Sequence, residues 1–170
     1  LSNQLNPMTA SKKTFEILFG SPPQKSSLDY FEATELVKDF VRNAEYQQAA
    51  AIGLQFAKLA PDDHAAQLLA AMALHMSHEL VTANQFADRA LAIDDTDADT
   101  RYLKCRICMD LGNKKEALEH IEAAVCNDPD NSRLNCILGQ QLLRAGDIDA
   151  GKRYLHLAIS LDQRNIDAFS

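Results

Sequence analysis

The feature that most constrains this chain is an internal period of about 34 residues. Gly139 stands one period after Cys105, which stands one period after Ala71, and other small or apolar residues recur in the same way. A period of about 20–50 residues indicates stacked supersecondary units, each unable to bury its hydrophobic face alone. The register divides the chain without insertion into the units 30–63, 64–97, 98–131 and 132–165.

Each unit predicts two helices joined by a short turn. In the third unit, apolar and small residues recur at helical spacing over 99–111 and again over 115–127. Gly112-Asn113 separates the two runs, because these residues adopt the left-handed conformation that ends helices. Pro129 stops the second helix, since proline cannot donate the next helical hydrogen bond. With six glycines and five prolines, the chain has too few turn residues for a β-sandwich.

The units resemble tetratricopeptide repeats, whose signature has small residues at unit positions 8, 20 and 27, and often proline at position 32. Small residues are needed where helix axes approach closely. Here positions 8, 20, 27 and 32 are held by Val37, Ala71, Cys105 and Gly139; by Ala49, Ala83, Ala117 and Gly151; by Phe56, Ala90, Ala124 and Ala158; and by Pro61, Asp95, Pro129 and Gln163. The resemblance implies an all-α fold, a right-handed α-solenoid of stacked helix–turn–helix repeats.

One position departs from the family pattern in every unit. Position 4 is usually aromatic or leucine, but here it holds Ala33, Gln67, Arg101 and Asn135. We therefore expect each first helix to lack one apolar anchor.

Two segments flank the repeats. Residues 1–29 are expected to be a polar segment with a short amphipathic helix over about 12–19, followed by a Pro/Ser linker. Phe15, Leu18 and Phe19 would form one side of that helix. A helix this short is marginal alone, so it should pack on the first unit, in the groove, or on a second copy to form a homodimer. Residues 166–170 are expected to begin a capping helix or a truncated further unit.

Composition excludes several classes of partner. With 17 Lys+Arg against 24 Asp+Glu, the net charge of −7 argues against nucleic acid, which requires a basic face. The sequence has no run of 18 apolar residues that could cross a membrane. The four cysteines lie within apolar helical patterns, as expected of reduced thiols, and no signal peptide is visible. A cytoplasmic location is the expectation.

Three motifs could carry chemistry, but each has a simpler interpretation. The pair Cys105-x-x-Cys108 lies in mid-helix at packing positions, whereas a redox pair belongs at a helix N-terminus. The pair His75-x-x-His78 has the spacing of metal ligands but no obvious third ligand. The acidic stretch 94–99 lacks the glycine and closing glutamate of a calcium loop. We expect no catalytic residue, metal or cofactor, and hence no enzyme.

The resemblance implies that the first helices line a concave groove through unit positions 2, 5, 9, 12 and 13. On this chain those positions place an apolar centre between basic residues, and the pattern that clamps the C-terminal carboxylates of chaperone tails is absent. Such a groove suits an amphipathic helix or an extended apolar segment carrying some negative charge. The candidate partner-binding residues are Lys38, Arg42, Leu68, Met72, His75, Tyr102, Arg106, Met109, Arg133 and Gln140.

The sequence therefore favours a non-enzymatic interaction module, a scaffold or adaptor that binds a protein or peptide partner. Two alternatives stay open. Acidic proteins of this kind with a helix before the repeats are similar to type III translocator chaperones of bacterial secretion, although those usually carry three repeats. The chain could instead be the regulatory repeat segment of a larger enzyme.

Overall fold

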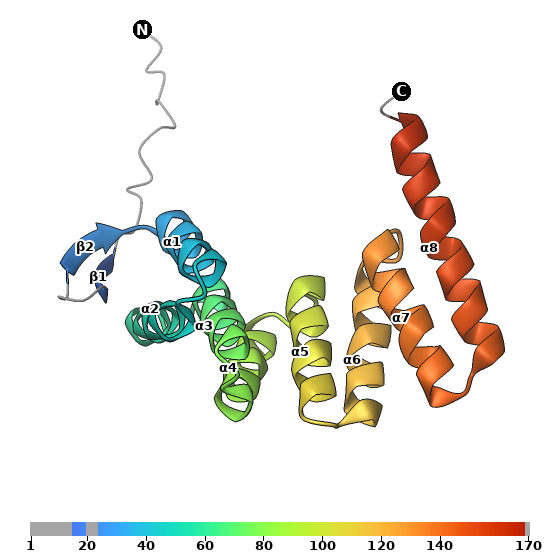
Figure 1. Ribbon diagram of the computed structural model, residues 1–170, viewed down its shortest axis with the longest axis horizontal. Coiled ribbons are helices and arrows are strands. Elements are labelled where there is room, and N and C mark those ends of the chain that lie inside the picture. Colours follow the sequence, from blue (N-terminus) through green and yellow to red (C-terminus); the bar gives the residue numbers. More distant parts are fainter. Residues whose placement is uncertain (1–14, 20–23, 169–170) are drawn as a thin grey trace, which may run out of the picture.

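The computed structural model describes residues 15–19 and 24–168. Over these residues, helices follow one another in pairs along the long axis of the molecule, after a short N-terminal β-hairpin (Figure 1). This architecture confirms the predicted α-solenoid. The helices are α1 (Tyr30–Arg42), α2 (Tyr46–Leu59), α3 (His64–Met76), α4 (Leu80–Ile93), α5 (Ala98–Asp110), α6 (Lys114–Asn127), α7 (Ser132–Ala145) and α8 (Ile148–Ala168).

A carboxylate or amide side chain starts the first helix of every unit. Asp29, Asp63, Asp97 and Asn131 are spaced by one period, and each accepts a hydrogen bond from the backbone N–H three residues later. The donor–acceptor distances range from 2.7 Å at Asp97 to 3.2 Å at Asn131. These side chains satisfy N–H groups that have no partner within the helix. The acidic stretch 94–99 thus contains a helix cap, as its position before a helix predicts.

In the second, third and fourth units, the residue at position 4 ties the first helix to the turn that precedes it. Gln67 Nε2 donates to the carbonyl of Pro61 at 3.0 Å, and Asn135 Nδ2 donates to the carbonyl of Pro129 at 2.8 Å. Arg101 Nε donates in the same way to the carbonyl of Asp95 at 2.7 Å. In all three cases the acceptor lies six residues earlier. In these three units the apolar anchor that is usual at this position is therefore replaced by a polar side chain that binds the inter-unit turn.

Small residues permit the closest helix contacts, as the sequence predicted. In the fourth unit, a Cβ added to Gly139 would lie 2.9 Å from the carbonyl oxygen of Gly151 and 2.8 Å from Leu155 Cγ. No side chain fits at that distance, so glycine at positions 8 and 20 allows α7 and α8 to touch through their backbones. In the first unit the closest approach lies elsewhere: a Cβ on Gly53 would be 2.9 Å from Ala70 Cα in the next unit.

The predicted helix over about 12–19 is wrong where the structure describes it. Residues 12–14 and the Pro22-Pro23 linker lie outside the described residues, but Phe15–Phe19 is a strand, β1, paired antiparallel with β2 (Gln24–Leu28). The physical reason is a period of two: Ile17 is fully buried whereas its neighbour Leu18 is 53% exposed.

The hairpin covers the N-terminal end of the solenoid. Ile17 belongs to the same buried cluster as Ile52 and Phe56 of α2. The amide of Gln55 pairs with the backbone of Leu18 in both directions, accepting from its N–H at 2.9 Å and donating to its carbonyl at 2.7 Å. Gln55 thus satisfies the outer edge of β1 as a neighbouring strand would. Of the three packing sites considered for this segment, the structure shows the first unit.

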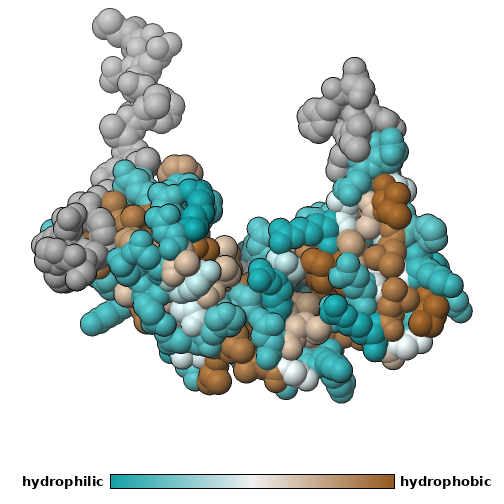
Figure 2. Space-filling model, in the orientation of Figure 1, coloured by the Kyte–Doolittle hydropathy of each residue, from teal (hydrophilic) through white to brown (hydrophobic). Residues whose placement is uncertain are grey.

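The expected new element at 166–170 is also wrong for its described part. Residues 166–168 continue α8, which runs from Ile148 to Ala168. Gln163 stands where Pro61 and Pro129 follow the second helices of other units, so no proline interrupts this helix. Hydrophobic surface lies along α8 (Figure 2), where Ile159 is 67% exposed. None of the helices in the described part of the chain is long and apolar enough to cross a bilayer.

Candidate functional site

The expected groove residues differ in exposure. Six side chains are open to solvent: Lys38, Arg42, Met72, Arg106, Arg133 and Gln140. Three are partly buried: Leu68, Tyr102 and Met109. The tenth, His75, is only 6% exposed. Nine of the ten positions therefore present at least part of their side chain on the first helices.

His75 corrects the expectation of an open groove histidine. Its Nε2 lies 2.7 Å from Oδ2 of Asp110, across the junction between α3 and α5. The same structure separates His75 from His78, because His78 follows the end of α3 with a φ of 62° and is exposed. His75 thus connects two units and is closed to a ligand, and the two histidines do not share a helix face.

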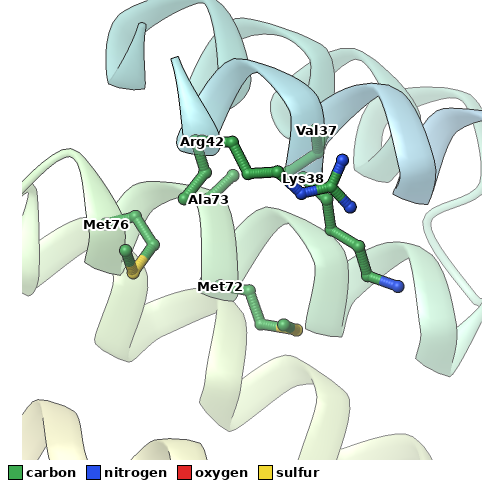
Figure 3. Close-up of a pocket in the computed structure, with 7 residues that line it drawn as sticks. Val37, Lys38, Arg42, Met72, Ala73 and Met76 are labelled. Atoms are coloured by element: carbon green, nitrogen blue, oxygen red, sulfur yellow. The ribbon is translucent and has the colours of Figure 1, made fainter. Parts of the chain in front are cut away.

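A hydrophobic pocket lies between the first helices α1 and α3. It has a volume of about 260 Å³ and is lined by Val37, Lys38, Val41, Arg42, Met72, Ala73 and Met76. The labelled residues of Figure 3 come from these two helices, with the sulfur-bearing side chains on α3 and the two cations on α1. Methionine side chains are flexible and polarisable, so such a pocket can adapt to apolar groups of different shape.

The cations at this pocket are paired within their own helix. Lys38 Nζ lies 2.7 Å from Oε1 of Glu35, and Arg42 forms an ion pair with Asp39. Both pairs are exposed, with each side chain at least 41% accessible. The positive charges of Lys38 and Arg42 are therefore largely compensated, so the pocket would bind a ligand mainly through apolar contacts.

A second pocket lies at matching repeat positions two units later. It has a volume of about 230 Å³ and is lined by Met109, Lys114, Leu118, Gln141, Arg144 and Ala145. Met109 stands two periods after Val41, as do Gln141 after Ala73 and Arg144 after Met76. The repeat thus builds two hollows of similar size, one apolar and one with amide and cationic groups.

On the first helices α5 and α7, an aromatic ring lies beside two arginines. The Cζ atoms of Arg133 and Arg106 lie 4.6 and 5.8 Å from the centre of the Tyr102 ring, within the range of cation–π attraction. Arg133 Nη2 also donates a hydrogen bond of 2.9 Å to the Tyr102 hydroxyl. The three side chains come from α5 and α7, at groove positions 5, 9 and 2.

The cysteine pair is placed as packing residues. Cys105 and Cys108 are 1% and 0% exposed. Burial raises the pKa of Cys105 to about 11, and burial together with the nearby Glu116 carboxylate raises the pKa of Cys108 to about 12. Both thiols therefore stay protonated near neutral pH, which makes them poor nucleophiles.

One cluster of ligand-type residues was not anticipated. Cys108 Sγ, a carboxylate oxygen of Glu116 and a ring nitrogen of His120 all lie within 4.8 Å of one another. Beside them, the 2% exposed Lys104 places its Nζ 3.6 Å from Glu116 Oε1 and in contact with Asp88. The buried ammonium already supplies the positive charge that a metal ion would bring. We interpret the cluster as an ion network that joins α4, α5 and α6.

Sequence reasoning missed Lys104 and the pocket residues Val37 and Ala73. The signal for Lys104 was present in the register, because position 7 holds Ala70 and Leu138 in the neighbouring units. Residues aligned with alanine and leucine face a core. Val37 and Ala73 occupy positions 8 and 10, whose side chains are shared between helix packing and the pocket wall.

Comparison with known proteins agrees with the repeat architecture. The sequence model described as tetratricopeptide repeat matches residues 74–140. A comparison with curated protein sequences gave no match.

Solved structures share the fold at low sequence identity. A crystal structure of MamA is 20% identical, with a TM-score of 0.71 and 81% of each chain covered. TTC0263 of Thermus thermophilus, described as a thermophilic TPR protein, is 14% identical with a TM-score of 0.72, covering 82% of this chain and 77% of that one. YrrB, described as a TPR protein with an unusual peptide-binding site, is 17% identical with a TM-score of 0.64, covering 78% and 66%. At these identities the likeness concerns the fold alone.

Proposed function

Residues 74–140 match the tetratricopeptide repeat model, and the chain folds as a solenoid of helix pairs. We therefore propose that it is a non-enzymatic interaction module that binds a peptide or amphipathic helix of a partner protein along its first helices. The observation that carries this proposal is the apolar pocket between α1 and α3. It lies on the groove side, it is open, and its cations are already paired with carboxylates.

The size and chemistry of the pocket suit one bulky apolar side chain. A volume of about 260 Å³ exceeds what a leucine or phenylalanine side chain fills, and the pocket is walled by valine, alanine and methionine. The 42% exposed Met72 stands at its open side and offers flexible contact area. A helix or an extended segment can both present such a residue. The peptide-binding site described for YrrB is consistent with this use of the fold.

The partner can be sought by pull-down with the intact protein and mass spectrometry, and its affinity then measured for variants. Met72→Asp places an unpaired carboxylate at the pocket and should weaken binding by on the order of 2 kcal/mol, the scale of a hot-spot residue. Tyr102→Ala should have an effect of similar size. Glu119→Ala on α6 is the control, because this exposed residue of a second helix should leave binding unchanged. A partner that binds both groove variants as tightly as the parent protein contradicts the proposal.

The secretion-chaperone alternative has lost the feature that motivated it. That likeness depended on a helix before the repeats, whereas the described part of this segment forms β1 and β2. We place the protein in the cytoplasm, since its four free cysteines, two of them fully buried, suit a reducing compartment.

A further inference from the structure

Tyr102, Arg106 and Arg133 form a group that lacks a negative partner within the chain. We name it the Arg–Tyr–Arg cluster. Among the residues that the structure describes, no carboxylate lies within 4.0 Å of either guanidinium, although the chain carries 24 acidic residues. By contrast, Arg42 at the other end of the groove is paired with Asp39. Two like charges beside one ring repel each other, so an anion between them would lower the electrostatic energy of the group.

The donors of the cluster suit a planar oxyanion. A guanidinium presents a rigid fork of N–H groups that matches a carboxylate. The Tyr102 hydroxyl accepts from Arg133, and within the described part of the chain no acceptor takes its own proton. A carboxylate placed between the arginines could therefore accept hydrogen bonds from three side chains.

We propose that the Arg–Tyr–Arg cluster binds a carboxylate of the partner segment, either an acidic side chain or the C-terminal carboxylate. This inference rests on the proposed function, because it concerns the same groove. It also gives the ligand a direction. The apolar residue enters the pocket between α1 and α3, and the carboxylate lies toward α5 and α7. The net charge of −7 would repel an acidic ligand elsewhere, so the cluster acts as the point of attraction.

Fluorescent dodecapeptide pools test this without knowledge of the partner. One pool is random in Leu, Ala, Ser and Glu, a second replaces Glu with Gln, and both end in an amide. A third is the Gln pool with a free C-terminal carboxylate, and a fourth contains Ala, Ser and Glu but no Leu. Anisotropy titrations are made with the parent protein, with Arg106→Gln/Arg133→Gln, with Arg89→Gln, and with Met72→Asp. Arg89 is a matched control, because its Cζ lies 4.7 Å from the centre of the Phe86 ring on the second helix α4.

For the parent protein we expect the Glu pool to bind about tenfold more tightly than the Gln pool, with a preference that decreases as salt is added. The double variant should lose that preference and Arg89→Gln should keep it. Tighter binding of the third pool than of the second would assign the carboxylate to the C-terminus, and equal binding would assign it to a side chain.

The inference is overturned if the preference for a carboxylate-bearing pool persists in the double variant, or if neither the Glu pool nor the third pool binds the parent protein more tightly than the second pool. In the second case, binding of both pools that is lost in Met72→Asp would leave the proposed function intact. Binding of the fourth pool that matches the first would contradict the apolar pocket while supporting the cluster. Failure of every pool to bind contradicts both proposals.

Discussion

Two junctions between units bury the same repeat position, one with an apolar residue and the other with a charged residue. At the junction of α2 with α3, position 7 of the second unit is Ala70, which is fully buried and faces Gly53. At the junction of α4 with α5, the same position of the third unit is Lys104, which is 2% exposed. In the second, third and fourth units this position is buried, but the repeat does not determine whether the buried group is apolar or charged.

The difference shows what each junction requires from its neighbours. Gly53 has no side chain and Ala70 has only a methyl group, so the backbones of α2 and α3 approach so closely that a Cβ on Gly53 would not fit. Lys104 needs carboxylates, because an ammonium removed from water without a partner costs several kcal/mol. Asp88 of α4 and Glu116 of α6 supply them from both sides. One junction is therefore sensitive to added volume, and the other is sensitive to lost charge.

The largest effect should follow from adding volume at the tight junction. Gly53→Leu places a Cβ 2.9 Å from the backbone of Ala70, so α2 and α3 must separate. We expect a loss of about 3 kcal/mol in the free energy of unfolding, at the upper end for overpacking. Urea denaturation measures it. Ala51→Leu, on the exposed side of the same helix, should change stability by less than about 0.5 kcal/mol. Similar losses in both variants would show that α2 and α3 are not in tight contact there.

The next effect removes charge at the other junction. Asp88→Asn with Glu116→Gln leaves the Lys104 ammonium buried without an anion and should cost about 2–3 kcal/mol. Adding Lys104→Met to this pair should restore most of the stability, because a buried apolar side chain of similar length needs no partner. If the triple variant is no more stable than the double variant, the loss did not arise from the unpaired lysine.

A smaller effect is expected at a feature that both junctions share. Gln67→Met removes the hydrogen bond to the carbonyl of Pro61 but also an amide oxygen that has no partner within the described residues. The two terms oppose each other, so we expect a net loss of about 0.5–1 kcal/mol by thermal or urea denaturation. Gln85→Met, at an exposed position of α4, is the control and should be neutral. A gain in stability for Gln67→Met would mean that the unpaired oxygen outweighs the hydrogen bond.

The smallest effect concerns pH and the Lys104 junction. Burial, and then the charge of Lys104 and Arg101, lower the pKa of His120, although Glu116 and Asp88 act in the opposite direction. A histidine whose folded pKa is lowered favours folding fully above its ordinary value of about 6.5, and this contribution decreases as the pH falls through the folded pKa. In His120→Gln, the free energy of unfolding should therefore change less with pH just below about 6.5 than it does in the parent protein.

A second titration at the same junction lies at lower pH. Although burial acts in the opposite direction, Lys104 and the hydrogen bond from Cys108 lower the pKa of Glu116. The stability that Glu116 contributes is present above its ordinary pKa range and is lost as the pH falls through the lowered pKa.

The two titrations are separated by measuring the free energy of unfolding against pH. If the profile of His120→Gln between about pH 6.5 and the carboxylate range is the same as that of the parent protein, the first step does not arise from His120.

The period of the sequence predicted the solenoid because local signals repeat with it. The caps Asp29, Asp63 and Asp97 and the stops Pro61 and Pro129 recur in the register of the repeat, so each unit specifies its own ends. The N-terminal segment carries no such repetition. Over five residues, Phe15–Phe19 fits a strand as well as a helix, and contact with α2 decides between them.

The groove was predictable in outline and not in detail. Repeat positions place Met72, Arg106 and Arg133 on the exposed side of the first helices, as a helical register must. His75 is paired with Asp110 of the next unit. Arg42 forms an ion pair with Asp39, whereas the arginines of the Arg–Tyr–Arg cluster have no carboxylate partner among the described residues. Such differences arise from side-chain pairs, which a repeat position does not specify.

The hydrogen bonds made by the position 4 side chains have a mechanical consequence. Gln67, Arg101 and Asn135 fasten each unit to its predecessor at the beginning of its first helix. Both pockets lie at the opposite end, near the inner turns. One edge of the solenoid is thus held by these hydrogen bonds, whereas at the other edge His75 and Asp110 join the second and third units. Because each pocket lies between two neighbouring units at that second edge, a ligand that fills it would change the angle between those two units.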